Sequence, residues 1–187
     1  MFRHLVLLSL ALLLGACQSD SINRDFDARR DFGGYRTWSW KEPGVQYQPD
    51  DPRVKSDLTE QRIRQAIGDQ LDQRGLRLAP ANGQGDVKVQ AWLIVENRQQ
   101  LVSSNYGGGW GPWGGYGYMG GPMTTETRSV DYKVTTLQID LFDGKDGKLV
   151  WRASAERILS NNTTHPTERD TAIRATVARI LEQYPPR

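Results

Sequence analysis

The sequence predicts an α+β domain in which an antiparallel sheet of about four or more strands carries two helices packed on one face. Several segments alternate apolar and polar residues, as strands do, and two others place apolar residues at helical spacing. The strand segments follow one another as hairpins, without a regular alternation of strands and helices. Hairpins favour an antiparallel sheet, and helices then cover one of its faces.

The strand predictions begin at residues 35–40, where alternation places Trp38 and Trp40 on one face. Residues 43–52 are rich in Pro, Gly and Asp, so we expect no regular element there. Residues 87–96 alternate over ten positions and predict a long strand with a partly buried second face.

Residues 128–142 predict another long strand, but its apolar positions change from even to odd numbers along the segment. A β-bulge near Thr135-Thr136 would restore one buried face, and two buried faces are the alternative. The polar turn at residues 143–148 leads into a further alternating segment, so residues 128–156 predict a hairpin.

The first predicted helix runs from Leu58 to about Arg74, and Gly75 follows at the position where helices commonly end. Asp57 and Glu60 have the spacing of a capping box. The second helix is expected to open near Pro166 and to end before the prolines that close the sequence.

The N-terminus has the three parts of a secretory signal: a basic start, about ten apolar residues and a small-residue cleavage site. The apolar run is too short to cross a bilayer, which takes roughly 20 residues. Leu14-Gly15-Ala16-Cys17 resembles the lipobox of bacterial lipoproteins, so residues 1–16 are predicted to be removed and Cys17 to be lipidated. The alternative is an ordinary signal peptide with a chance cysteine.

Lipidation would also explain a single cysteine in an exported chain, because one cysteine cannot form an internal disulfide. Two or more acyl chains, such as palmitate, anchor a protein stably. By analogy with other lipoproteins, Gln18 favours the outer membrane, with the protein facing the periplasm. We expect a polar tether over residues 17–28 and a single domain over residues 29–187.

Six segments together resemble the lipoproteins grouped as domain-of-unknown-function family 4136. They follow the expected order and cover most of the mature chain: residues 31–40, 74–76, the strand after Asp86, 137–143, 148–153 and 180–186. The resemblance implies an envelope lipoprotein with an α+β domain. It brings no established activity, cofactor or catalytic residue.

The most unusual segment is residues 107–121, in which nine of fifteen residues are glycine and four are Trp or Tyr. Three interpretations remain open: a flexible insertion whose aromatic side chains collapse onto the domain, a stacking platform for sugar rings or peptidoglycan, and a contact with lipid headgroups or an envelope protein. The glycines forbid the helix that a dinucleotide-binding loop needs. The candidate contact residues are Trp110, Trp113, Tyr116 and Tyr118.

No catalytic motif stands out in the sequence. His165 is the only histidine left after cleavage and is interpreted as a helix-entry residue beside Pro166. A zinc site would need several His or Cys ligands, so neither a metal nor another cofactor is predicted. Paired carboxylates could still converge in the fold, the candidates being Asp31, Asp86, Asp131 and Glu156.

The balance of 24 basic and 22 acidic residues offers no field for nucleic acid. The sequence therefore predicts a non-enzymatic envelope lipoprotein that acts as a binding or structural module. Its expected partners are the membrane, reached through the lipid on Cys17, and peptidoglycan, a glycan or an envelope protein. The alternative is an envelope hydrolase that uses carboxylates.

Overall fold

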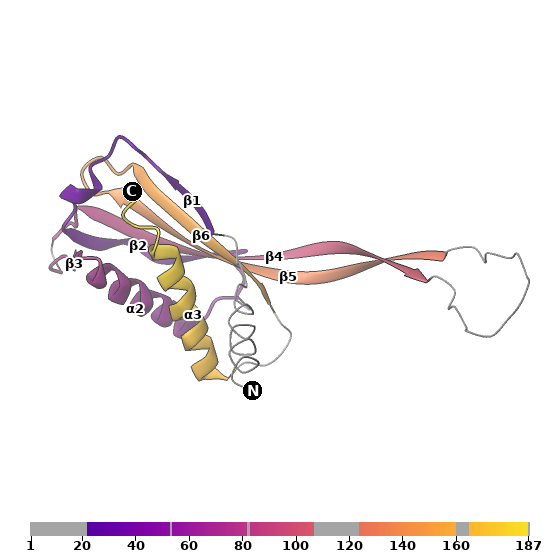
Figure 1. Cartoon of the computed structure of the whole chain (residues 1–187). Coiled ribbons are helices and arrows are strands. Elements are labelled where there is room, and N and C mark those ends of the chain that lie inside the picture. The colour runs from indigo at the N-terminus through magenta and orange to yellow at the C-terminus, as the bar shows by residue number, and fades with distance from the viewer. Residues whose placement is uncertain (1–21, 53, 82, 107–123, 160–164, 187) are drawn as a thin grey trace, which may run out of the picture.

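Two helices lie on one face of a curled six-stranded sheet, and one hairpin of the sheet extends far beyond it (Figure 1). The computed structural model describes residues 22–52, 54–81, 83–106, 124–159 and 165–186. The strand order is β1-β6-β5-β4-β2-β3. These strands are β1 (Ile22–Phe26), β2 (Thr37–Gln48), β3 (Arg77–Leu78), β4 (Val87–Tyr106), β5 (Thr124–Asp143) and β6 (Leu149–Leu159).

The α+β prediction is confirmed, but the sheet is mixed rather than wholly antiparallel. β1, β6, β5 and β4 pair antiparallel in that order, whereas β2 pairs parallel with both β4 and β3. The parallel pairs arise because helix α2 (Asp57–Gln73) connects β2 to β3 and β4 as a crossover. The sequence analysis expected hairpins throughout, and a hairpin cannot join parallel strands. It therefore missed the β2–α2–β4 crossover.

The expectation of no regular element over residues 43–52 is wrong for the first half of that segment. β2 pairs with β4 up to Trp40, leaves the ladder, and pairs again from Val45 to Gln48. Pro43 falls in this bulge, where a missing backbone N–H removes no ladder hydrogen bond. The bulge predicted near Thr135-Thr136 is absent, because β5 pairs with β4 without a shift along its whole length.

The predicted tether of residues 17–28 is likewise wrong over Ile22–Phe26, which forms the edge strand β1. β1 pairs with Ala155–Trp151 of β6, and Ile22 and Phe26 pack against the core. Three consecutive polar residues, Asn23, Arg24 and Asp25, concealed the strand in the sequence.

The core lies between the helices and one face of the sheet. α2 contributes Ile63, Ala66, Ile67 and Leu71, and helix α3 (Pro166–Leu181) contributes Val177, Ile180 and Leu181. The odd-numbered positions of β4 and β5 fill the layer opposite, as their alternation predicts. A short helix, η1 (Phe32–Gly34), precedes β2 and adds Phe32, which meets Tyr184 edge to face.

The helix ends agree with the sequence except at one cap. Gly75 adopts a φ of 86° just after α2, as expected for a residue that ends a helix. The N-cap of α2 is Ser56, not Asp57, because the Ser56 hydroxyl accepts from the backbone N–H of Thr59. α3 begins at Pro166, and the backbone N–H of its N-cap, His165, donates to Glu168.

Candidate functional site

Two features of the described chain are candidates for function: an acidic cavity at one end of the sheet and the hairpin that leaves its other end. The cavity has a volume of about 440 Å³. It lies where β2 and β4 begin and β5 ends. Four of its lining residues are aspartates, which raises the question of carboxylate catalysis. The full lining is Arg30, Asp31, Gly34, Tyr35, Asp86, Asp143, Lys145 and Asp146.

Asp143 is the most enclosed carboxylate of the cavity, with 8% of its side chain exposed. One oxygen accepts from the Tyr35 hydroxyl at 2.8 Å and from Arg30 at 3.3 Å. The other accepts from the backbone N–H groups of Lys145 at 2.8 Å and Asp146 at 3.1 Å. Burial acts to raise the pKa of Asp143, but these donors outweigh it and hold the pKa below its usual value.

Asp86 connects the first residues of β2 and β4. One of its oxygens accepts from the backbone N–H groups of Arg36 and Thr37 and from the Thr37 hydroxyl, each at 2.9 Å. The two backbone donors lower the pKa of Asp86 most. Asp146 forms an ion pair with Arg30 at 2.5 Å, and that hydrogen bond lowers its pKa.

The cavity therefore has the chemistry of a structural clasp. Its three strongly bonded carboxylates are stabilised in the charged form, whereas a glycosidase-type acid needs a raised pKa. A packing observation agrees: the Gly144 backbone N–H donates to the Asp86 carbonyl at 2.7 Å, and a Cβ on Gly144 would collide with the Gly85 carbonyl oxygen.

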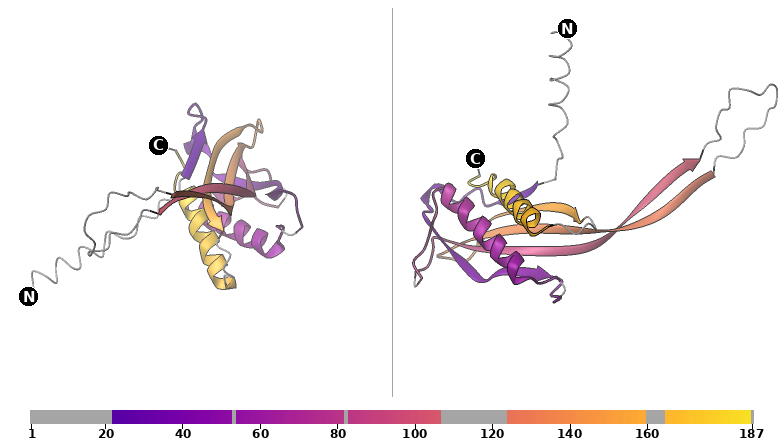
Figure 2. Two further views of the ribbon diagram at one scale, coloured as in Figure 1. Left: turned by 90° about the vertical axis from the view of Figure 1, so that its right-hand side faces the viewer. Right: turned by 90° about the horizontal axis from the view of Figure 1, so that it is seen from below.

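At the opposite end of the sheet, β4 and β5 continue with no other strand beside them among the described residues. β2 pairs with β4 only up to Ile94, and β6 pairs with β5 only from Lys133 onward. Beyond these points Arg98–Tyr106 pairs with Thr124–Tyr132 alone, and we call this two-stranded ribbon the arm. Its nine residue pairs correspond to roughly 30 Å, and the arm points away from the helices and the sheet (Figure 2).

The arm contributes nothing to the hydrophobic core of the described chain. It nevertheless carries three of the large hydrophobic side chains that are exposed: Leu101 at 72%, Val102 at 41% and Val130 at 43%. Within the part of the chain that the structure describes, both of its edges also leave backbone N–H and C=O groups without a neighbouring strand.

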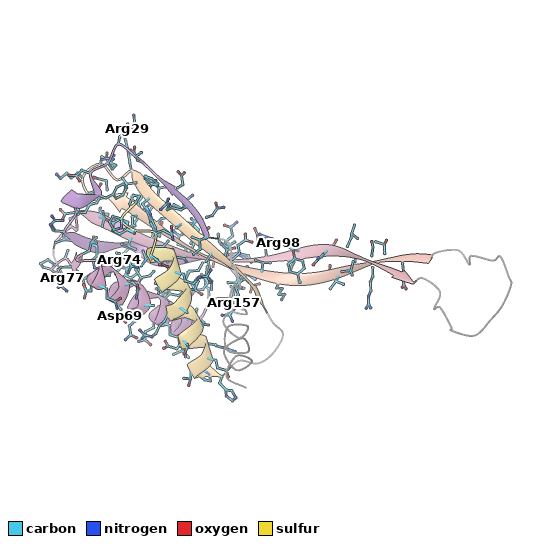
Figure 3. The ribbon with its side chains drawn as sticks, viewed as in Figure 1. Arg29, Asp69, Arg74, Arg77, Arg98 and Arg157 are labelled. Atoms are coloured by element: carbon cyan, nitrogen blue, oxygen red, sulfur yellow. The ribbon has the colours of Figure 1, made fainter. Side chains whose placement is uncertain are left out.

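An ion-pair cluster marks the base of the arm. Arg98 of β4 donates to both oxygens of Glu156 on β6, each at 2.9 Å, and to Glu96 at 2.9 Å. Its side chain therefore crosses β5, on the face where Val134 is buried. The hydrogen bonds from Arg98 lower the pKa of Glu156. Figure 3 shows Arg98 where the arm leaves the sheet.

The face of the sheet that no helix covers is polar and internally paired. Asp140, with 1% of its side chain exposed, accepts two hydrogen bonds of 2.7 Å from Arg152. Gln138 donates to the same carboxylate at 3.2 Å. The Lys41 ammonium lies 3.7 Å from the centre of the Phe142 ring. These contacts give Asp140 an ionic partner in Arg152 and place Lys41 against an aromatic ring.

Only two of the four carboxylates considered in the sequence lie at one site. Asp31 and Asp86 line the cavity, Asp131 lies on the arm, and Glu156 lies at the base of the arm. Across the described residues, no cluster of three or more His, Cys, Asp or Glu side chains could hold a metal ion. The same part of the chain contains no helix long and apolar enough to cross a membrane.

The remaining predicted site residues lie outside the described residues: Cys17, Trp110, Trp113, Tyr116 and Tyr118. The described flanks of the glycine-rich segment, Tyr106 and Thr124, pair with each other at the far end of the arm. Sequence analysis missed most of the arm: the strand predicted over residues 128–142 reaches only its last five β5 residues, and no strand was predicted over residues 98–106. For the rest of the arm, the signal in the sequence was a run of Thr, Ser and Gln on both sides of residues 107–121.

Among solved structures, the fold is similar to a PDZ domain protein from Parabacteroides distasonis ATCC 8503, at 16% identity and a TM-score of 0.54. That match covers 89% of this chain and 35% of the other, so this chain spans about a third of that protein. A DUF4136 family protein from Bacteroides thetaiotaomicron VPI-5482 matches at 19% identity and a TM-score of 0.46, covering 90% and 97% of the two chains.

A third match is the lipoprotein GNA1162 from Neisseria meningitidis, at 11% identity and a TM-score of 0.37, covering 78% of this chain and 97% of that one. No curated protein matches the sequence. The family model named domain of unknown function DUF4136 matches residues 22–186, from the first residue of β1 to the C-terminal prolines. The chain therefore belongs to the DUF4136 family.

Proposed function

We propose that the protein is a non-enzymatic binding module of the bacterial envelope, anchored by lipid at Cys17, with the arm as its contact surface. The arm is the observation that carries the proposal. A two-stranded ribbon alone is marginally stable in water, and stable sheets need a third strand or a packed face. A ribbon of nine pairs that adds nothing to the core is thus best explained by a contact outside the domain.

The chemistry of the arm favours a protein partner over a glycan. Its free edges present rows of backbone donors and acceptors, which a strand of another chain satisfies. Its exposed side chains include Leu101, Val102 and Val130. A polar sugar polymer would leave these apolar side chains in contact with water. The Trp and Tyr residues of 107–121 follow the last residue of β4, so the same arm would carry them to the partner.

The carboxylates of the acidic cavity favour a binding module over the alternative function, a hydrolase. A hydrolase with two carboxylates keeps one protonated as the acid and one charged. In the described chain, every carboxyl pKa that the surroundings shift moves downward. Asp86 and Asp143 also each accept from two backbone N–H groups of other residues.

The anchor would hold the domain close to the membrane. β1 begins at Ile22, only five residues after Cys17, and five residues span at most about 18 Å. Gln18 follows the cysteine, which we take to favour the inner leaflet of the outer membrane. The sheet would then start near the lipid surface.

The anchor is tested by replacing Cys17 with serine in the full chain. We expect the unlipidated protein to leave the membrane pellet for the soluble periplasmic fraction while its circular dichroism spectrum stays the same. A variant that remains in the pellet after a high-salt wash would contradict the anchor.

The arm is tested with a variant in which residues 99–131 are replaced by Asn-Gly, a pair suited to a two-residue hairpin turn. The matched control replaces only residues 107–121. Formaldehyde crosslinking of intact cells should give adducts with the native protein that are absent with the arm-less variant. Adducts that persist unchanged without the arm would contradict the arm as contact surface.

A further inference from the structure

We propose that the arm binds the arm of a second copy of this chain, by antiparallel pairing of the free β4 edges with Leu101 on the two-fold axis. This inference rests on the proposed role of the arm as contact surface and names the partner. The two β4 edges would join two ribbons into one four-stranded sheet, in the order β5-β4-β4-β5.

The free edge of β4 is long and carries little charge. It runs from Val95, the first residue beyond the last pair with β2, to Tyr106. Its only charged residues are Glu96 and Arg98, and both are held at the base by their mutual ion pair and by Glu156. From Gln99 to Tyr106 the edge has no charge. Charges are what commonly protect an edge from pairing.

The free edge of β5 differs in this respect. Over the same length it carries Glu126, Arg128 and Asp131, and Lys133 follows where β6 begins to pair. An approaching strand would have to accommodate these charges directly opposite its own side chains. The uncharged β4 edge is therefore the one that we expect to pair with another strand.

Leu101 identifies the centre of the pairing. At 72% exposure it is the most exposed of the large hydrophobic residues that stand out on the described surface. The free stretch from Val95 to Tyr106 has its midpoint at Gln100 and Leu101. A two-fold axis at Leu101 therefore uses residues 96–106 of both copies, almost the whole free edge.

The edge is complementary to itself in this register. In an isologous contact each residue meets its counterpart across the axis, and in antiparallel strands opposite residues share one face. Leu101 would meet Leu101 of the second copy, and no charged residue would meet one of like charge. The other pairs are Gln100 with Val102, Gln99 with Ser103, Arg98 with Ser104, Asn97 with Asn105 and Glu96 with Tyr106.

A disulfide scan of the full chain in intact cells tests this register. Directly opposite residues have Cα atoms about 4.5–5.5 Å apart, which suits a disulfide, so Leu101→Cys should give a linked dimer when an oxidant is added. Ser103→Cys alone should not, because residue 103 of the second copy lies four residues away, about 14 Å. Co-expression of Gln99→Cys with Ser103→Cys should restore the crosslink.

The controls separate this proposal from the one on which it rests. The unmodified chain has only Cys17 and should give no crosslink. A crosslink there would mean a free Cys17 thiol and would contradict the lipid anchor, while the scan in a Cys17→Ser background would still decide the pairing. Val130→Cys, on the β5 strand of the arm, should also fail to crosslink.

A disruptive variant gives an independent readout. Leu101→Lys places two like charges on the axis and should weaken self-association of the detergent-extracted protein at least about tenfold, measured by light scattering after size-exclusion chromatography. Leu58→Lys, also at an exposed leucine, is the matched control and should leave it unchanged. A monomeric native protein, crosslinking at Val130 in place of Leu101, or unchanged association of Leu101→Lys would each overturn the proposal.

Discussion

Replacing Asp86 with alanine removes the acceptor that holds the first residues of β2 against the start of β4. One carboxylate oxygen accepts from two backbone N–H groups and the Thr37 hydroxyl, each at 2.9 Å. The variant therefore tests whether the acidic cavity is a structural clasp.

The expected loss follows from the environment of the three donors. A hydrogen bond to a charged group contributes about 1.5–3 kcal/mol, and less where water can replace the acceptor. The contact with Arg36 is exposed, and the two with Thr37 are part-buried. We expect Asp86→Ala to lower the free energy of unfolding by about 2 kcal/mol, or about 4–8 °C in Tm for a chain of this size.

The pKa of Asp86 determines how its contribution to stability changes with pH. The pKa of Asp86 is lowered in the folded protein, so its contribution is complete above the unfolded value of about 3.9 and is lost as pH falls through the folded pKa. We would measure urea unfolding in the unlipidated Cys17→Ser protein, with and without Asp86→Ala. The difference in the free energy of unfolding between the two proteins should be constant above about pH 5 and should shrink in acid.

Asp131→Ala, at an exposed position of the arm, is the control and should change little. A loss below about 0.5 kcal/mol for Asp86→Ala would refute the clasp, since that is the size of an ordinary surface substitution. A loss that grows toward acid pH would refute the assigned charge state.

Three further predictions use the same unfolding assay. Gly144→Ala should cost at least about 2 kcal/mol, because its Cβ would meet the Gly85 carbonyl oxygen, whereas Gly34→Ala, with its nearest atom at 3.4 Å, should cost little. Arg152→Ala should cost about 3 kcal/mol by leaving the Asp140 carboxylate buried and unpaired, and Asp140→Val in the same chain should recover part of it. The arm-less variant, with residues 99–131 replaced by Asn-Gly, should stay within about 1 kcal/mol of the native protein, because the arm adds nothing to the core. A larger loss there would mean that the arm is part of the folding unit.

The parts of the fold that were predictable are those with local signals. Three features depend only on residues that are close together in the sequence. They are the β5–β6 hairpin, the end of α2 at Gly75 and the start of α3 at Pro166. The helix face of α2 followed from its apolar spacing in the same way.

The missed parts depend on contacts between distant residues. β1 is a polar edge strand that needs β6 as its template, and the parallel pairing of β2 with β4 needs α2 as a crossover. The change of phase along β5 left a bulge or two buried faces open. The strand has no bulge against β4, so Val134 and Leu137 are buried on opposite faces of the sheet. Val130 lies on the exposed arm, and Leu137 lies on the face covered by the helices.

The candidate site was predictable only in part. The glycine-rich segment drew attention to the connection between β4 and β5, whose described flanks are the two strands of the arm. Most of the arm was hidden, since an exposed ribbon has no buried face and therefore no periodicity to read. The sequence analysis identified two of the four aspartates of the acidic cavity. Asp31 and Asp86 were candidates for paired carboxylates, whereas Asp143 and Asp146 were interpreted as parts of a turn.

The central claim, that the arm is the contact surface, is tested most directly by photocrosslinking in intact cells. A benzophenone amino acid would replace Leu101 on the arm in one variant and Leu58 on α2 in the other, both at exposed positions. We predict adducts from position 101 and none from position 58. Adducts from position 58 with none from position 101 would contradict the claim.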